Sequence, residues 1–184
     1  RADRNPGSLP RATATLVRKL ALALHEAHAR GIVHRDLKPT NVFVDDRGEP
    51  VIVDFGLARR TKHQDAALTQ TGEVLGSPAY MAPEQALSQA EPVGSHSDIY
   101  SLGVIMYELL TGVRPFRGER VLDVLAQVLD AKPEPPRVHR PELAPALEAV
   151  CLKAMAKRAA DRYPTMQDMA DAIGVGFQVR IAST

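Results

Sequence analysis

The sequence contains a single cysteine and no long run of apolar residues. Cys151 has no second cysteine among the 184 residues to pair with, so no disulfide can form within the chain. Its surroundings, LEAVCLKAM, predict an apolar helix and therefore a buried, unreactive thiol. No apolar run approaches the roughly 18 to 20 residues that a membrane-spanning helix needs. We therefore expect no membrane span and a cytoplasmic location for this chain. A membrane anchor elsewhere in a longer parent protein is compatible with both expectations.

Neither sign of charge is in excess. The chain has 23 Lys and Arg residues against 22 Asp and Glu residues, a net charge of +1. Such a balance provides no basic field to attract nucleic acid or anionic lipid, so neither is an expected partner. The length suits one domain and is too short for two ordinary ones. Because the first residue is Arg and no signal-peptide pattern follows it, we expect a fragment of a longer protein.

The apolar pattern predicts a mainly helical domain with one short β-hairpin. Leucines at four-residue intervals predict an amphipathic helix over residues 15–29, ended by Gly31. Residues 42–44 and 51–53 are β-branched and aromatic runs separated by the turn sequence DDRGEP, which predicts two paired strands. The segment 98–110 is apolar on nearly every side and predicts a helix buried in the middle of the domain.

The remaining segments predict a long loop and three more helices. Residues 59–96 show no sustained period, which is typical of a long surface loop. Thr165, preceded by proline, is a predicted helix N-cap. Helices are expected at 119–131, 141–156 and 165–173, with the Pro-rich KPEPPRVHRP as a joint and 174–184 as a tail or the start of a linker.

Four polar residues around the predicted hairpin suggest a phosphoryl-transfer site. Asp54 follows a strand expected to be buried and precedes Gly56, which permits an unusual backbone angle. Asn41 opens the partner strand, so pairing should bring its amide oxygen near Asp54 as a second oxygen ligand for Mg²⁺. Asp36 and Lys38 lie just upstream, two residues apart on an extended segment, and can point to the same side. Lys38 can then offer its charge to a phosphoryl group.

Three motifs in fixed order resemble the signature of the eukaryotic-type protein kinases. They are HRDLKPTN (34–41), DFG (54–56) and APE (82–84). The segments MAPEQ and SDIYSLGVIMYELLTGVRPF look like the bacterial serine/threonine branch in particular. The resemblance covers residues 9–173 and implies the carboxy-terminal lobe of a kinase domain of the α+β class, with 1–8 as a residual linker. It further implies ATP with Mg²⁺ or Mn²⁺ as cofactors, and proteins carrying Ser or Thr as substrates.

The same resemblance implies roles for the catalytic and nucleotide-binding residues. Asp36 resembles the catalytic-loop base, which orients the substrate hydroxyl and accepts its proton late. Lys38 resembles the γ-phosphate contact of the serine/threonine class. Asn41 and Asp54 resemble the two metal ligands, and Phe43 the apolar residue under the adenine.

Regulatory and structural roles follow in the same way. The activation segment would span 54–84, with Thr69 and Thr71 as candidate phosphate acceptors and Ser77 near its substrate-facing end. Arg35 would pair with a phosphate on that segment. Asp98 would hold the catalytic-loop backbone, and Glu84 would form a buried ion pair with Arg162. Structural roles are therefore implied for His34, Phe55, Gly56, Glu84, Asp98 and Arg162.

Some parts that the family requires are absent from the sequence. No Gly-rich phosphate loop, strand Lys or helix Glu precedes His34, so we expect the isolated chain to bind ATP feebly and to turn over little. A pseudokinase, and a truncated interaction module with an exposed apolar surface around Phe43 and Phe55, remain alternatives, and the parent could self-associate. His25 and His28 are offset by three residues, whereas a zinc helix needs four, so a solvated helix face is expected there.

Overall fold

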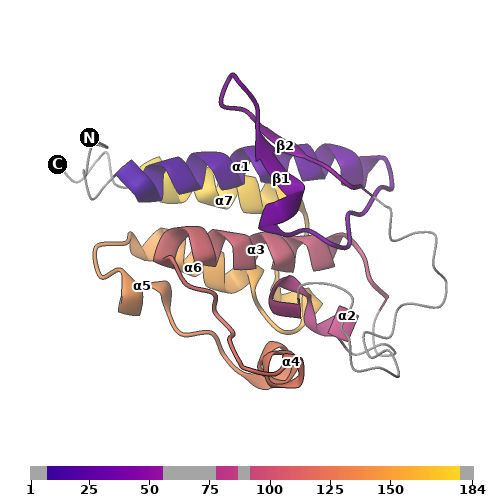
Figure 1. Cartoon of the computed structure of the whole chain (residues 1–184). Helices are drawn as coiled ribbons and strands as arrows, with labels where there is room; N and C mark the ends of the chain where they lie inside the picture. The colour runs from indigo at the N-terminus through magenta and orange to yellow at the C-terminus, as the bar shows by residue number, and fades with distance from the viewer. Residues whose placement is uncertain (1–7, 56–77, 87–91, 179–184) are drawn as a thin grey trace.

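The computed structural model describes residues 8–55, 78–86 and 92–178, and within them seven α-helices accompany one two-stranded antiparallel sheet (Figure 1). Three short 3-10 helices lie among these elements. In chain order the elements are α1 (Ser8–Ala29), a 3-10 turn (Pro39–Asn41), β1 (Val42–Val44), β2 (Pro50–Ile52), a 3-10 turn (Pro78–Tyr80), α2 (Pro83–Ala86), α3 (Ser95–Thr111), α4 (Val121–Asp130), α5 (Pro136–His139), α6 (Pro145–Ala154), a 3-10 turn (Ala159–Asp161) and α7 (Met166–Gln178).

Helix α3 is the centre of the packing, as its apolar sequence predicts. It contacts α1 on one side and α6 on the other, while α7 closes the bundle against α1 and α6 (Figure 1). The approach to α6 is very close, because a Cβ on Gly103 would lie 2.8 Å from the Cβ of Ala154. Cys151 on α6 is fully buried there, and burial raises the pKa of its thiol. The prediction of a buried, unreactive cysteine is therefore confirmed.

Helix α1 is longer than predicted. It begins at Ser8 and not at residue 15, because its buried stripe continues through Thr13, Val17 and Leu20 into the Ala-rich start of the helix. A proline in the first turn does not oppose this start, since the amides there have no partner within the helix. The helix ends at Ala29, and Gly31 follows in the left-handed region with φ +72°, in agreement with the prediction.

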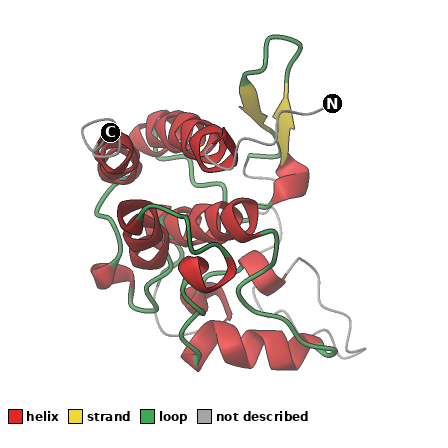
Figure 2. Ribbon diagram, turned by 90° about the vertical axis from the view of Figure 1, so that its left-hand side faces the viewer, coloured by secondary structure: helices red, strands yellow, loops and turns green. Residues whose placement is uncertain are grey.

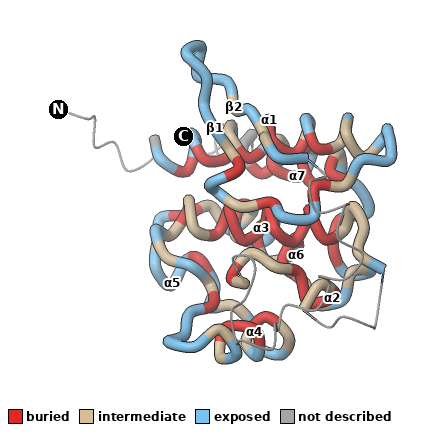
Figure 3. The backbone as a smooth tube through the Cα atoms, turned by 45° about the vertical axis from the view of Figure 1, so that its right-hand side comes forward, coloured by how far each residue is buried: buried red, intermediate tan, exposed pale blue. Residues whose placement is uncertain are grey.

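The hairpin forms in the predicted place with Val42 opposite Ile52, but it is not buried. The second strand starts at Pro50, one residue before the prediction. Its turn is closed by Asp45, whose Oδ1 accepts the amides of Arg47 and Glu49. The hairpin stands out from the helices, exposed along most of its length (Figures 2 and 3). The expectation of a buried strand before Asp54 is wrong because only the helical side of the hairpin has a packing partner among the described residues.

Three further expectations need correction. The described end of the predicted surface loop is packed, since Ala82, Pro83 and Glu84 are buried at the start of α2. The Pro-rich joint contains the short helix α5, because Pro136 occupies its first turn, where no amide is needed. The predicted tail is helical as far as Gln178, and α7 has the expected N-cap, since Thr165 Oγ1 accepts the amide of Asp168 at 3.1 Å. None of the helices in the described part is long and apolar enough to cross a membrane.

Candidate active site

A buried carboxylate from the central helix holds the backbone of the predicted catalytic loop. Asp98 on α3 is 1% exposed, and its two carboxylate oxygens accept the backbone amides of His34 and Arg35, each at 2.8 Å. Arg35 has φ +70°, a left-handed conformation that costs a non-glycine residue about 1 to 3 kcal/mol and persists only when its surroundings fix it. Asp98 thus anchors a strained backbone immediately before Asp36.

His28 is a third partner of Asp98, and it was missed in the sequence. Its Nε2 lies 2.8 Å from Asp98 Oδ2, and the side chain is only 10% exposed. The prediction that His28 belongs to a solvated helix face is wrong, because α3, which carries Asp98 in its first turn, packs against α1. No local sequence pattern predicts this contact, since the two partners are 70 residues apart in the sequence.

His34 connects the catalytic loop to the end of the hairpin. It is 1% exposed, its Nε2 lies 2.9 Å from the carbonyl oxygen of Val53, and its Nδ1 accepts the amide of Asp36 at 3.3 Å. Since Nδ1 is the acceptor, Nε2 carries the hydrogen and donates to Val53. The ring also packs on Phe55, with 5.0 Å between centroids. His34 is therefore a buried structural residue that links the catalytic loop to residues 53–55.

Asp36 and Lys38 point to the same side of the loop, as predicted. Lys38 Nζ donates to Asp36 Oδ2 at 2.7 Å, and the Asp36 side chain is 48% exposed, so it is open to a partner from solution. The Asn41 side chain turns inward: its Nδ2 donates to the Asp36 backbone oxygen at 2.8 Å. This bond leaves the Asn41 amide oxygen as the end that can coordinate a cation.

Asp54 lies directly beyond the hairpin, next to the residue that pairs with Asn41. The Val53 amide donates to the Asn41 carbonyl oxygen at 3.0 Å, so the next residue along, Asp54, leaves the strand beside Asn41. Asp54 is exposed and itself has φ +62°. Within the described ranges no group of three or more His, Cys, Asp or Glu side chains could hold a metal ion. One carboxylate and one amide oxygen fit Mg²⁺, which keeps several waters and is completed by substrate phosphates.

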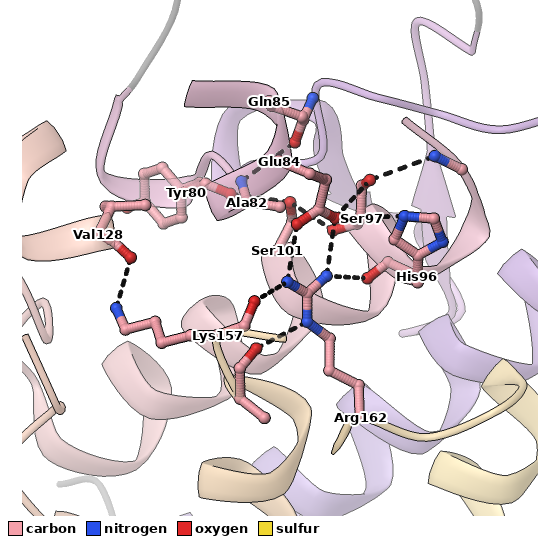
Figure 4. A network of polar contacts seen from close by, with 12 residues as sticks. Tyr80, Ala82, Glu84, Gln85, His96, Ser97, Ser101, Val128, Lys157 and Arg162 are labelled. Atoms are coloured by element: carbon pink, nitrogen blue, oxygen red, sulfur yellow. Dashed lines mark hydrogen bonds and ion pairs between the residues drawn. The ribbon is translucent and has the colours of Figure 1, made fainter. Parts of the chain in front are cut away.

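Glu84 and Arg162 form a buried ion pair (Figure 4). Arg162 Nη1 and Nη2 each donate to one Glu84 carboxylate oxygen at 2.8 Å, and Ser97 Oγ donates to the same carboxylate at 2.8 Å. Burial raises the pKa of Glu84, but the hydrogen bonds and charge of Arg162 outweigh it and hold the pKa below its ordinary value. The pair fixes the start of α2 to the body of the domain.

Two further contacts hold residues 80–85 to other parts of the domain, and neither was predicted from the sequence. The Tyr80 hydroxyl donates to Glu108 on α3, 2.5 Å away. The Gln85 amide nitrogen donates to the Arg35 carbonyl oxygen at 2.7 Å.

Comparison with known proteins identifies the family. The protein kinase domain matches residues 5–172. This chain belongs to the protein kinase family. It is 40% identical over 88% of its length to a probable serine/threonine-protein kinase of Corynebacterium efficiens, and 42% identical over 83% of its length to the probable serine/threonine-protein kinase PknB of Corynebacterium glutamicum. It is also 40% identical over 90% of its length to the serine/threonine-protein kinase PknB of Mycolicibacterium smegmatis. The chain covers 24% to 26% of these three relatives.

Protein kinases in general use ATP and a divalent metal ion. Among the predicted site residues, Asp36 is hydrogen-bonded to Lys38 and to Asn41, and Asp54 follows Val53, whose amide bonds to Asn41. Phe43 lies on the strand with 56% of its surface exposed. The predicted residues Gly56, Thr69, Thr71 and Ser77 lie outside the described residues.

Proposed function

We propose that this chain is the carboxy-terminal lobe of a serine/threonine protein kinase. The full-length protein that contains it would transfer the γ-phosphoryl group of ATP to Ser and Thr hydroxyls of proteins. The observation that carries this proposal is the Asp36–Lys38 pair, 2.7 Å apart, on a loop whose backbone is tied to the central helix by Asp98. Phosphoryl transfer depends almost entirely on positioning and charge, and this loop supplies both.

Each polar residue then has a role in the transfer. Asp36 orients the substrate hydroxyl and accepts its proton late, because a loose transition state does not require a strong base. Lys38 neutralises charge on the transferred phosphoryl group and orients Asp36 through their ion pair. Asn41 and Asp54 would hold the divalent ion, Mg²⁺ or Mn²⁺, through one amide and one carboxylate oxygen.

The exposed hairpin supports the assignment to one lobe. Phe43 and Val51 are opposite each other on the two strands and are 56% and 44% exposed, an apolar surface that a stable domain normally covers. In the proposed kinase it is the floor of the adenine site and contacts the lobe that carries the Gly-rich loop. Residues 9–173 would form the carboxy-terminal lobe, and this lobe alone would bind ATP feebly because half of the nucleotide pocket is not built from it.

We also propose that the activation segment, 54–84, is regulated by phosphorylation. Arg35 is exposed beside Asp36, where its guanidinium can pair with a phosphate on Thr69 or Thr71, and Ser77 would face the substrate. Mass spectrometry of the full-length protein after incubation with ATP and Mg²⁺ tests this. Modification of either threonine is expected, and the absence of phosphate from both would overturn the regulatory role.

A transfer assay tests the main proposal. The full-length protein, given γ-labelled ATP, Mg²⁺ and a generic basic protein, should transfer label to Ser and Thr side chains, and residues 1–184 alone should do so far more slowly or not at all. Binding of ATP without any transfer would support a pseudokinase or scaffold instead. Equal rates for the short and full-length chains would contradict the assignment to an incomplete lobe.

A further inference from the structure

Gln85 joins two segments that are far apart in the sequence through one side-chain amide. Its Oε1 accepts the backbone amide of Ala82 at 3.1 Å, as shown in Figure 4, and its Nε2 donates to the backbone carbonyl oxygen of Arg35 at 2.7 Å. The first bond caps the start of α2, a common use of Gln at the third helical position. The second bond does nothing for α2, because its acceptor lies 50 residues away in the catalytic loop.

The acceptor belongs to the peptide that carries Asp36. Arg35 is held in the left-handed region with φ +70°, which a non-glycine residue avoids unless it is restrained. Its amide is fixed by Asp98 Oδ1 at 2.8 Å, and its carbonyl is fixed by Gln85. The carbonyl of Arg35 and the amide of Asp36 share one peptide plane, so a rotation of that plane would reorient the start of Asp36.

The backbone of Gln85 is itself immobilised. Ala82 is fully buried, and the neighbouring Glu84 is bonded through both carboxylate oxygens to Arg162. The hydrogen bond from Gln85 to Arg35 therefore connects an immobilised residue, just after the activation segment, to the peptide next to Asp36.

We propose that Gln85 is a positioning residue for Asp36, which couples the packed end of the activation segment at residues 82–86 to the backbone geometry of the catalytic loop. This inference rests on the proposed kinase function, in which Asp36 orients the substrate hydroxyl. The two bonds need an acceptor at one end of the side chain and a donor at the other, and the amide of Gln85 supplies both. A carboxylate could still cap α2 but would turn a second acceptor towards the Arg35 carbonyl.

The decisive variant is Gln85→Glu in the full-length protein. It keeps the size of the side chain and the acceptor for Ala82, and it removes the donor to Arg35. We expect kcat to fall roughly 10-fold to 100-fold, the scale for misplacing a catalytic group, with KM for ATP within about 2-fold of wild type. The control is Gln167→Glu, the same change on α7, where the native amide nitrogen donates to Asp171 at the exposed surface of the same helix; it should leave kcat within about 2-fold.

Hydrogen exchange gives a readout that does not depend on catalysis. In Gln85→Glu, the amides of His34 and Arg35 should exchange faster than in wild type, while amides in α1 and α7 keep their protection. A full-length wild-type protein without kinase activity would refute the proposed function, and the exchange measurement would still test the coupling. An active wild type whose Gln85→Glu variant keeps both its kcat and its loop protection would overturn the coupling itself.

A second variant covers the case in which Gln85→Glu fails to fold. Gln85→Met removes both hydrogen bonds without adding charge, and it should lower kcat by a similar factor while α7 stays protected. A folded Gln85→Met protein with kcat within about 2-fold of wild type would also overturn the proposal.

Discussion

The two terminal guanidinium nitrogens of Arg162 each donate a hydrogen bond of 2.8 Å to one carboxylate oxygen of Glu84, and the two residues are 78 positions apart in the sequence. The rest of the guanidinium is satisfied as well, because it donates to the backbone oxygens of Ala156, His96 and Lys157 (Figure 4). A buried ion pair contributes little relative to apolar residues of the same shape, but it becomes costly when one partner is lost. The pair therefore enforces one arrangement of α2.

Removing the carboxylate of Glu84 should strongly destabilise the folded protein. Glu84→Ala leaves the buried Arg162 charge unpaired, and we expect the free energy of unfolding to fall by about 3 to 5 kcal/mol. Urea denaturation of the variant and the wild type measures this. The control is Glu119→Ala, an exposed glutamate, which should change stability by less than about 0.5 kcal/mol. A loss below about 1 kcal/mol for Glu84→Ala would contradict the pairing.

The contribution of Glu84 to stability should disappear in acid. Its pKa in the folded protein lies below the ordinary value of 4.5, so below that pH the unfolded chain takes up a proton first. The stabilisation is complete above pH 4.5 and is lost as the pH falls through the folded-state pKa. The difference in unfolding free energy between wild type and Glu84→Gln should therefore shrink from pH 7 to pH 3. A difference that stays constant over this range would show that the pKa of Glu84 is the same in the folded and the unfolded protein.

The contact between His28 and Asp98 predicts an asymmetry between two histidines on one helix. His28→Ala removes one of three partners of a buried carboxylate and should lower stability by about 1 to 3 kcal/mol. His25, three residues earlier on α1, is only partly buried, and His25→Ala should cost less than about 0.5 kcal/mol. Thermal or urea unfolding compares them. Equal losses for both variants would mean that the contact of His28 with Asp98 contributes nothing to stability.

The sequence predicted the elements whose pattern is local. The buried helix α3, the hairpin and the N-cap at Thr165 each depend on residues close together in the chain, so periodicity and turn chemistry were sufficient. The start of α1 and the exposure of the hairpin were predicted wrongly. Both depend on what packs against the element, and no local pattern carries that information.

The candidate site shows the same division. Asp36, Lys38, Asn41 and Asp54 stand in sequence motifs, and the structure joins the first three by hydrogen bonds. The resemblance to the kinases implied that Asp98 holds the loop, and its carboxylate does accept two loop amides. His28 and Gln85 were not found as partners, because a His on a helix or a Gln after a motif has no distinctive spacing. Their contacts span 70 residues for His28 and Asp98, and 50 residues for Gln85 and Arg35.

Loss of the hydroxyl should affect stability differently at Tyr80, which contacts α3, and at Tyr100, which lies on α3. Burial and the Glu108 carboxylate raise the pKa of Tyr80, so its phenol stays protonated as a donor, and Tyr80→Phe should cost about 1.5 to 3 kcal/mol. The Tyr100 hydroxyl is buried with no hydrogen-bond partner among the described residues, so Tyr100→Phe should be neutral or stabilising. Urea denaturation distinguishes them. Equal destabilisation would point to a partner for Tyr100 that the described residues do not include.

Asp36→Asn tests the role that the proposed function gives to the loop carboxylate. In the full-length protein it should lower the rate of phosphoryl transfer roughly 10²-fold to 10⁴-fold, the scale of general-base catalysis, and leave ATP affinity nearly unchanged. Single-turnover transfer and nucleotide titration measure the two quantities separately. The control, Asp46→Asn, alters an exposed carboxylate in the hairpin turn and should change neither. If Asp36→Asn abolished ATP binding while bound ATP still reacted at the wild-type rate, Asp36 would be a nucleotide ligand and another group would orient the hydroxyl.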